Sequence, residues 1–536
     1  MAKFVSVMPG TTRLALGLSL LAALIPVTPV AGVVPVPCTQ AGGLSDRCEI
    51  WAARASRGEA EDVLADPSAG RVYVAATAVG PQGGSGDAFV YAYKSSTGAE
   101  LWRLSRDGGA NDYDAANDLT LSGDGSRLCL SAGITPGAGP VQGVPSGADI
   151  LVLCVHPDSG ELLWERTYDM PTGRDDTADG GMIEASVPVA GQRRDTLFVG
   201  GFSGPAPLMD DGTSKDLLTL AIDPETGNVL WKATYDGPGN AWEVPRGFAV
   251  SPDGRRVFIT GESAGVGTWH DYATVAYDAA TGEQLWASRY EGLGGNLADE
   301  PNALTLSPAG DMVVVTGGSE ESPGDFRWAT VAYDSATGEE LWAARYAGTP
   351  PPSPVPGDIR PTGGSPNFHL TGRDDEATAL VFSPGGTAVY VTGFARAFPN
   401  GTDYITIAYS TSDGEAQWTG RYDGPAHRLD QAADIAVNAS GSRIYVTGNS
   451  SGVGLWIQGD QDTRGYALDD VATVAYDAAG TQQWAARYDG DQYTDVGSAL
   501  ELGGDILYVA GRAGWKDPQE LFSLNHADPL TLAYAA

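Results

Sequence analysis

Residues 276–286 read AYDAATGEQLW, and this phrase decides the fold because it recurs along the chain. In each copy an apolar strand is followed by a turn that usually contains Thr-Gly, and the next strand carries a tryptophan. Before each copy lie two short apolar strands around a tight turn, seen clearly as ALTLSPAGDMVVVTG at residues 303–317, a pattern typical of a hairpin. The seven copies place their tryptophans at Trp102, Trp164, Trp231, Trp286, Trp342, Trp418 and Trp484.

Each repeat therefore predicts four short strands, a to d, with apolar residues on both faces. Such sheets need a neighbour on each side, and stacking them around an axis supplies one. Strands a to c occur eight times, but the last copy reaches Tyr534 without a tryptophan strand. Residues 48–54 form a tryptophan strand, with Trp51, that has no unit of its own. Joining the two leaves no open edge in the ring.

The sequence thus predicts an all-β fold: a single eight-bladed β-propeller of four-stranded antiparallel blades over residues 48–536, closed by the N-terminal tryptophan strand. The predicted blades are approximately 57–106, 114–168, 176–235, 243–290, 299–346, 375–422, 430–488, and 495–536 together with 48–56.

The phrases AYDAATGEQLW and AIDPETGNVLW (221–231) resemble the tryptophan-docking repeats of quinoprotein, or PQQ-type, β-propellers. The VYVTG strand at 389–393 also resembles the repeats of bacterial surface and secreted propellers. The resemblance covers nearly all of residues 48–536 and implies the same fold. Its family includes PQQ- and calcium-dependent dehydrogenases and also non-enzymatic scaffolds such as outer-membrane assembly factors, so it leaves the function open.

The net charge and the N-terminal residues indicate the kind of partner and the cellular location. Lys and Arg total 32 against 68 Asp and Glu, a net charge of −36, which disfavours nucleic acid and suits cationic partners. Lys3 and Arg13, an apolar run at 14–25 and small residues at 31–32 predict a signal peptide over 1–32, followed by an N-terminal segment at 33–47. No stretch predicts a membrane span. We expect a secreted or extracytoplasmic monomer.

Four cysteines in an exported chain suggest disulfides. Of the three possible connectivities, the simplest pairs Cys38 with Cys48 and Cys129 with Cys154.

Two acidic positions recur on the face formed by the d–a and b–c connections, which we call the loop-bearing face. The longer connections are expected there, at 131–148, 203–215, 347–373, 449–469 and 512–527. One acidic position opens strand a: Asp114, Glu243, Asp299, Asp375, Asp430 and Asp495. The other opens strand c: Asp87, Asp149, Asp216, Asp271, Asp403, Asp470 and Asp528.

Because strand a lines the channel, the first set is expected to form a carboxylate ring at its mouth. Two interpretations remain open. Either each acid caps a loop amide or pairs with an arginine such as Arg289 or Arg345, or ring and loop oxygens hold a cation, for which Ca²⁺ fits best. Asp460 and Asp462 begin a segment that resembles a calcium loop, although an arginine follows where an oxygen ligand belongs.

Catalytic patterns are missing from the sequence. The five histidines form no closely spaced ligand pair, although His270 and His526 precede acidic residues that open strand c. There is no nucleophile elbow, no phosphate loop, and no adjacent Cys-Cys pair of the kind found in alcohol-oxidising quinoproteins. We expect no catalytic residues and a secreted binding or scaffold propeller, whose partner is a protein, a glycan or a cation. PQQ is not expected. The alternative is a PQQ- and Ca²⁺-dependent oxidoreductase.

Overall fold

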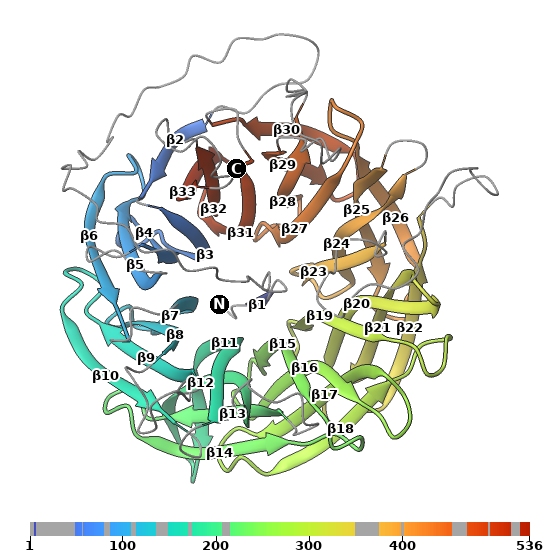
Figure 1. Ribbon diagram of the computed structural model, residues 1–536, viewed down its shortest axis with the longest axis horizontal. Coiled ribbons are helices and arrows are strands. Elements are labelled where there is room, and N and C mark those ends of the chain that lie inside the picture. Colours follow the sequence, from blue (N-terminus) through green and yellow to red (C-terminus); the bar gives the residue numbers. More distant parts are fainter. Residues whose placement is uncertain are drawn as a thin grey trace, which may run out of the picture.

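The computed structural model describes residues 5–6, 49–55, 57–79, 86–108, 114–135, 148–169, 174–205, 215–348, 375–397, 401–452, 469–490, 494–515 and 526–536. Within these ranges every regular element is a β-strand, and the strands form eight four-stranded antiparallel blades around a central axis (Figure 1). The predicted eight-bladed all-β fold is confirmed. The same ranges contain no helix with the length and apolarity needed to cross a membrane.

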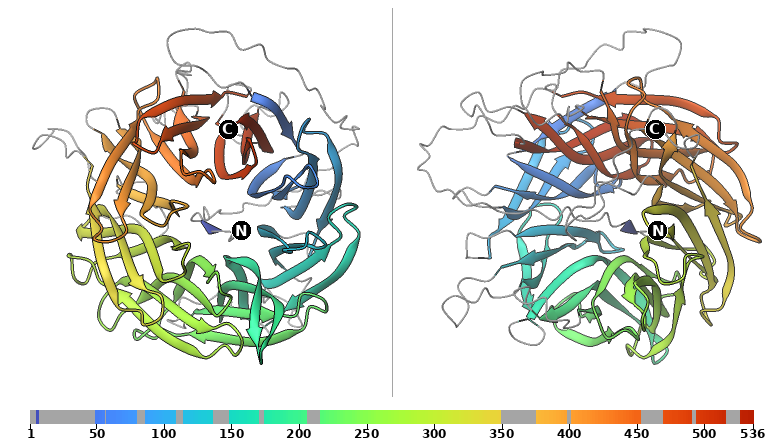
Figure 2. Two further views of the ribbon diagram at one scale, coloured as in Figure 1. Left: turned by 180° about the vertical axis from the view of Figure 1, so that it is seen from behind. Right: turned by 45° about the vertical axis from the view of Figure 1, so that its right-hand side comes forward.

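Strands a to d follow one another outward from the centre in each blade, as the views in Figure 2 also show. Blade 1 consists of β3 (Gly58–Asp66), β4 (Arg71–Ala78), β5 (Asp87–Lys94) and β6 (Glu100–Arg106), and blade 2 of β7 (Ala115–Leu121), β8 (Leu128–Ile134), β9 (Asp149–Val155) and β10 (Leu162–Tyr168). Blade 3 consists of β11 (Arg174–Val189), β12 (Gln192–Pro205), β13 (Asp216–Ile222) and β14 (Val229–Tyr235), and blade 4 of β15 (Glu243–Val250), β16 (Arg256–Ala264), β17 (His270–Asp278) and β18 (Gln284–Tyr290).

Blade 5 consists of β19 (Asp299–Leu306), β20 (Met312–Ser322), β21 (Asp325–Asp334) and β22 (Glu340–Tyr346), and blade 6 of β23 (Glu376–Phe382), β24 (Ala388–Ala397), β25 (Gly401–Ser410) and β26 (Ala416–Tyr422). Blade 7 consists of β27 (Asp430–Val437), β28 (Arg443–Ser451), β29 (Asp469–Asp477) and β30 (Gln482–Tyr488), and blade 8 of β31 (Val496–Gly503), β32 (Ile506–Trp515), β33 (His526–Ala535) and β2 (Glu49–Arg54). A short strand, β1 (Val5–Ser6), pairs with β15 and β19 near the centre of the ring.

Blade 8 is assembled from two distant parts of the chain. β2 pairs with β33 in antiparallel register, with Trp51 opposite Ala533, and so supplies the outer strand of this blade. Antiparallel pairing of β2 covers the edge that β33 would otherwise expose.

The repeat tryptophans join each blade to the next. Trp286 donates its indole N–H to the carbonyl of Ser335, 3.1 Å away in blade 5, and its ring lies against Gly338. Gly338 has a φ of +73°, and a Cβ there would lie 2.7 Å from Trp286 Cδ2. Trp51 makes the same bond to the carbonyl of Ser95 in blade 1, at 2.7 Å, so the junction of blades 8 and 1 resembles the others. Equivalent bonds are made by Trp102, Trp164, Trp231, Trp342 and Trp418.

Trp484 is the exception among the repeat tryptophans. Its side chain is buried, yet its indole nitrogen has no hydrogen-bond partner among the described residues. The other indoles bond to a turn between strands c and d of the next blade. In blade 8 those strands are β33 and β2, which come from opposite ends of the sequence, so no such turn joins them.

The apolar core lies between neighbouring blades. One buried cluster, for example, combines Leu64 and Tyr73 of blade 1 with Leu119 and Leu130 of blade 2. This packing explains why strands such as β9 are buried at every position. A disulfide joins Cys129 of β8 to Cys154 of β9, as predicted.

Cys38 and Cys48, the other predicted pair, lie outside the described residues. This pairing stays a prediction.

Candidate functional site

The acids that open strand a are almost completely buried, at 0–2% exposure for the predicted set. Asp114 accepts hydrogen bonds from the amides of Gly108, in the preceding d–a connection, and Thr135, after β8, both at 2.7 Å. Asp495 repeats the arrangement with Gly490 and Gly514. Amides of the preceding d–a connection also bond to Asp299, Asp375 and Asp430.

These contacts explain the recurrence of the strand-a acids. Their carboxylates bond to backbone amides at the junction between two blades and are withdrawn from solvent, so they do not form an open ring at the channel mouth. A glycine is needed opposite each of them: a Cβ at Gly292 would lie 2.5 Å from Oδ1 of Asp299. This geometry supports the first interpretation of the sequence, in which the acids cap loop amides.

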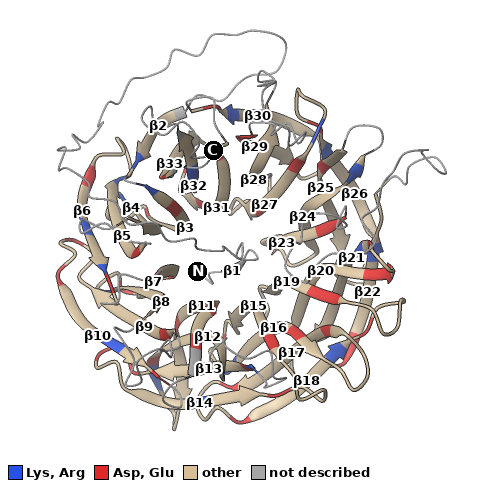
Figure 3. Ribbon diagram, viewed as in Figure 1, with Lys and Arg blue, Asp and Glu red and all other residues tan. Residues whose placement is uncertain are grey.

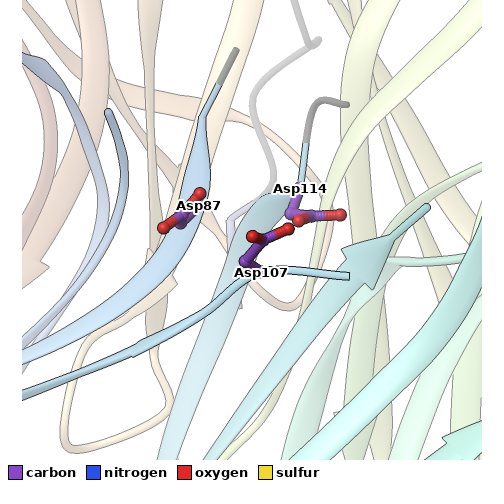
Figure 4. Close-up of side chains that lie close together, drawn as sticks. All are labelled: Asp87, Asp107 and Asp114. Carbon is purple, nitrogen blue, oxygen red and sulfur yellow. The ribbon is translucent and has the colours of Figure 1, made fainter. Parts of the chain in front are cut away.

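At four junctions a carboxylate that opens strand c meets the strand-a acid of the next blade. Figure 4 shows one of them, where Asp87 of β5, Asp107 after β6 and Asp114 before β7 come together. One oxygen from each side chain lies within 4.8 Å of the other two. The four junction clusters are Asp87/Asp107/Asp114, Asp149/Asp169/Asp176, Asp216/Asp236/Glu243 and Asp403/Asp423/Asp430.

The third member of each cluster lies five residues after the repeat tryptophan, at what we call the +5 position. Sequence reasoning missed it, although the signal is present as an acid followed in most repeats by glycine. In contrast to the buried strand-a acids, most +5 side chains are exposed on the loop-bearing face. The +5 acids are Asp107, Asp169, Asp236, Glu291, Asp423 and Asp489.

Burial and nearby carboxylates raise the pKa of Asp149 and of Glu243. Burial, then Asp169 and Asp176, raise the pKa of Asp149 to about 6. Burial is also the largest cause that raises the pKa of Glu243 to about 7, with contributions from its acidic neighbours. Two charges 4.8 Å apart repel by about 1 kcal/mol in water and roughly 3.5 kcal/mol at intermediate dielectric. Positive charge near the clusters would therefore stabilise the ionised protein.

Arginines supply that charge at some junctions. They lie three residues after the tryptophan, at the +3 position of blades 4 to 8. Arg289 pairs with Asp271 at 2.7 Å, and Arg487 with Asp470 at 2.6 Å. Arg421 is hydrogen-bonded to Asp403 within the fourth cluster. In blades 1 to 3 the +3 position instead carries Ser105, Thr167 and Thr234.

In blade 5 the strand-c position is itself an arginine. Arg327 occupies it and pairs with Asp375 of blade 6 at 3.1 Å.

Exposed apolar side chains lie beside these acids on the loop-bearing face around blade 4. Trp242 precedes β15 and is 49% exposed, and Trp269 precedes β17 and is 67% exposed. Val266 and Leu293, in neighbouring connections, are more exposed still. His270 packs its ring edge-to-face against Trp242, with centroids 4.9 Å apart.

The other candidate residues are His270, Asp528, Asp460 and Asp462. His270 bonds through Nδ1 to Glu262 at 3.2 Å, and Arg246 bonds to the same carboxylate. Asp528 lies in β33, two residues after His526. Asp460 and Asp462 lie outside the described residues, as does most of each longer predicted connection.

Eight blades joined by docked tryptophans define the class: a tryptophan-docked β-propeller. A family profile described as "Outer membrane protein assembly factor BamB" matches residues 46–219 and 214–385, which is more than half of the chain. The chain belongs to this family of PQQ-type repeat propellers. No curated protein sequence matches it.

Solved structures resemble the chain in fold. The quinohemoprotein alcohol dehydrogenase from Comamonas testosteroni is similar with 14% identity and a TM-score of 0.53, over 91% of this chain and 76% of its own. Sqt1 from Saccharomyces cerevisiae is similar with 10% identity and a TM-score of 0.51, over 91% of this chain and 98% of its own. At such low identity these likenesses concern the fold alone.

The residues on the loop-bearing face do not fit PQQ. This cofactor carries three carboxylates and needs positive groups around it. Around the described part of the face, Arg289, Arg327, Arg421 and Arg487 each already pair with an acid of the chain. Most of the neighbouring titratable groups are carboxylates.

Proposed function

We propose that the protein is a secreted, non-enzymatic binding propeller whose loop-bearing face holds a cationic protein partner. The observation that carries this proposal is the combination, on one face, of exposed tryptophans and a ring of exposed +5 acids. Acidic positions also surround the axis and outnumber basic ones (Figure 3).

Exposed aromatic side chains surrounded by charge are typical of binding surfaces. Trp242 and Trp269 provide large rigid contact areas, and tryptophan is enriched among residues that dominate binding energy. A lysine or arginine of a partner can lie over an indole face and also approach the +5 acids, so one basic segment could use both features. Complementary charge would also speed association and select against acidic partners.

The order of basic, apolar and small residues over 1–32 supports export through a signal peptide. The disulfide between Cys129 and Cys154 supports an oxidising compartment. Extracytoplasmic location and a binding role are consistent with the assembly-factor description of the matched family, although that description belongs to the family and not to this chain.

The test compares charge-matched variants against one probe, a fluorescent oligolysine peptide. E291Q/D489N removes two exposed +5 acids that lie outside the four junction clusters. E283Q/E339Q removes two exposed acids from turns on the opposite face, with the same change in net charge. We expect the first variant to weaken peptide binding by roughly fivefold and the second by less than about twofold, since an exposed ion pair contributes about 0.5 kcal/mol.

A third variant, W242A/W269A, tests the aromatic contribution. Loss of exposed cation–π contacts should weaken binding by about threefold or more without changing net charge. If all variants bind alike, or if both charge variants weaken binding equally, the peptide responds to overall charge and the proposed binding face is wrong.

A further inference from the structure

The junction of blades 3 and 4 contains a buried carboxylate that the Gly237 amide and the Ser263 hydroxyl contact, yet one of its oxygens has no hydrogen-bond partner among the described residues. Glu243 is 0% exposed, and its Oε2 has no hydrogen-bond partner in the described part of the protein. The other oxygen, Oε1, accepts a hydrogen bond from the Ser263 hydroxyl at 3.1 Å. Buried acceptors without a partner are rare because each forfeits its hydration, so this oxygen indicates a ligand position.

Two further carboxylates lie close to the Glu243 side chain. Asp216 opens β13 and Asp236 follows β14, and an oxygen from each lies within 4.8 Å of one from Glu243. Calcium–oxygen distances are about 2.3–2.6 Å, so two ligands of one ion are at most about 5 Å apart. The three side chains are therefore within reach of a single Ca²⁺. Because Asp236 is exposed, water could complete the coordination.

A comparison within the chain shows where a later blade places a cation. In blade 7 the +3 residue is Arg487, which pairs with the strand-c acid Asp470. In blade 3 the +3 residue is Thr234, and the strand-c acid is Asp216. The strand pairings are equivalent, since Leu218 lies opposite Thr234 as Ala472 lies opposite Arg487. The position that holds a guanidinium in blade 7 therefore carries no charge in blade 3.

The nearest arginine on the other side of the cluster does not replace that charge directly. Arg289 donates from Nη1 to the Ser263 hydroxyl at 2.6 Å, and this hydroxyl in turn bonds to Glu243 Oε1. The guanidinium pairs instead with Asp271. Oε2 of Glu243 is left for another cation.

We propose that Asp216, Asp236 and Glu243 bind a Ca²⁺ ion between blades 3 and 4, in the role that the +3 arginines have at later junctions. The site differs from the exposed +5 acids used to test the proposed partner, so either proposal can fail alone.

Native mass spectrometry of the full chain in about 1 mM calcium tests the proposal, since that concentration is at or above the dissociation constants of extracellular calcium sites, roughly 10⁻⁴–10⁻³ M. T234R places an arginine beside Asp216, and E243Q removes the buried ligand; each should bind one Ca²⁺ fewer than the wild type. R487T removes the arginine that pairs with Asp470 and should bind one more. The control E283Q, on the opposite face, should bind the same number.

Wild-type protein without bound calcium would overturn the proposal. The proposal would also be overturned if T234R and E243Q both bound as many Ca²⁺ ions as the wild type. If neither of these variants folds, R487T tests the proposal alone. An unchanged number of bound Ca²⁺ ions in R487T would contradict the idea that a +3 arginine and a Ca²⁺ ion substitute for each other.

Discussion

Replacing Glu243 by glutamine should stabilise the metal-free protein at alkaline pH, because the substitution removes a buried negative charge. Burial and the neighbouring Asp236 and Asp216 raise its pKa from 4.5 to about 7. A carboxyl whose folded-state pKa is raised favours the folded protein below its unfolded pKa and loses that contribution as pH rises through the folded value. At 1.4 kcal/mol per pKa unit, the charged form costs about 3 kcal/mol at pH 8 and less than about 1 kcal/mol at pH 5.

The assay is urea unfolding followed by tryptophan fluorescence, in chelator, at both pH values. We expect E243Q to raise the unfolding free energy by up to about 3 kcal/mol at pH 8 and to change it little at pH 5. The exposed control E283Q should be near neutral at both. If E243Q destabilises the protein equally at the two pH values, the carboxylate is well compensated in the fold and the electrostatic reasoning is wrong.

Three further predictions concern the ring, and calorimetric melting checks each. W286F should cost about 1–2 kcal/mol because it leaves the Ser335 carbonyl unpaired, whereas W484F should cost less because the indole N–H of Trp484 is already unpaired; equal losses would contradict this. G282A should destabilise by about 1–3 kcal/mol because the residue has a φ of +76° and abuts an indole, and a stabilising effect would contradict it. Removing the Cys129–Cys154 disulfide, which spans 25 residues, should cost about 3 kcal/mol, and an unchanged melting temperature under reduction would contradict that.

Much of the fold could be predicted because the repeated phrase specifies contacts as well as strands. A tryptophan and a turn glycine at fixed spacing place each blade against its neighbour, so Trp286 and Gly338 together imply stacking. The unpaired indole of Trp484 was not predicted, because it depends on the missing turn in blade 8 rather than on the residue's own repeat.

The candidate site could be predicted only in part. The alternation of strands places the acids that open strands a and c on one face, and the structure brings such acids together, as with Asp216 and Glu243. Sequence reasoning could not establish that strand-a carboxylates turn into the junction, because this depends on backbone amides such as that of Gly108. The exposed pair Trp242 and Trp269 lies outside the repeat pattern, so periodicity gave no indication of it.

Crystals grown with calcium and measured for anomalous scattering would test most directly whether the blade junctions need a positive charge from one source or another. We expect anomalous density among Asp216, Asp236 and Glu243, and none beside Asp470, which already pairs with Arg487. Density at both junctions, or an unoccupied first junction in saturating calcium, would contradict it.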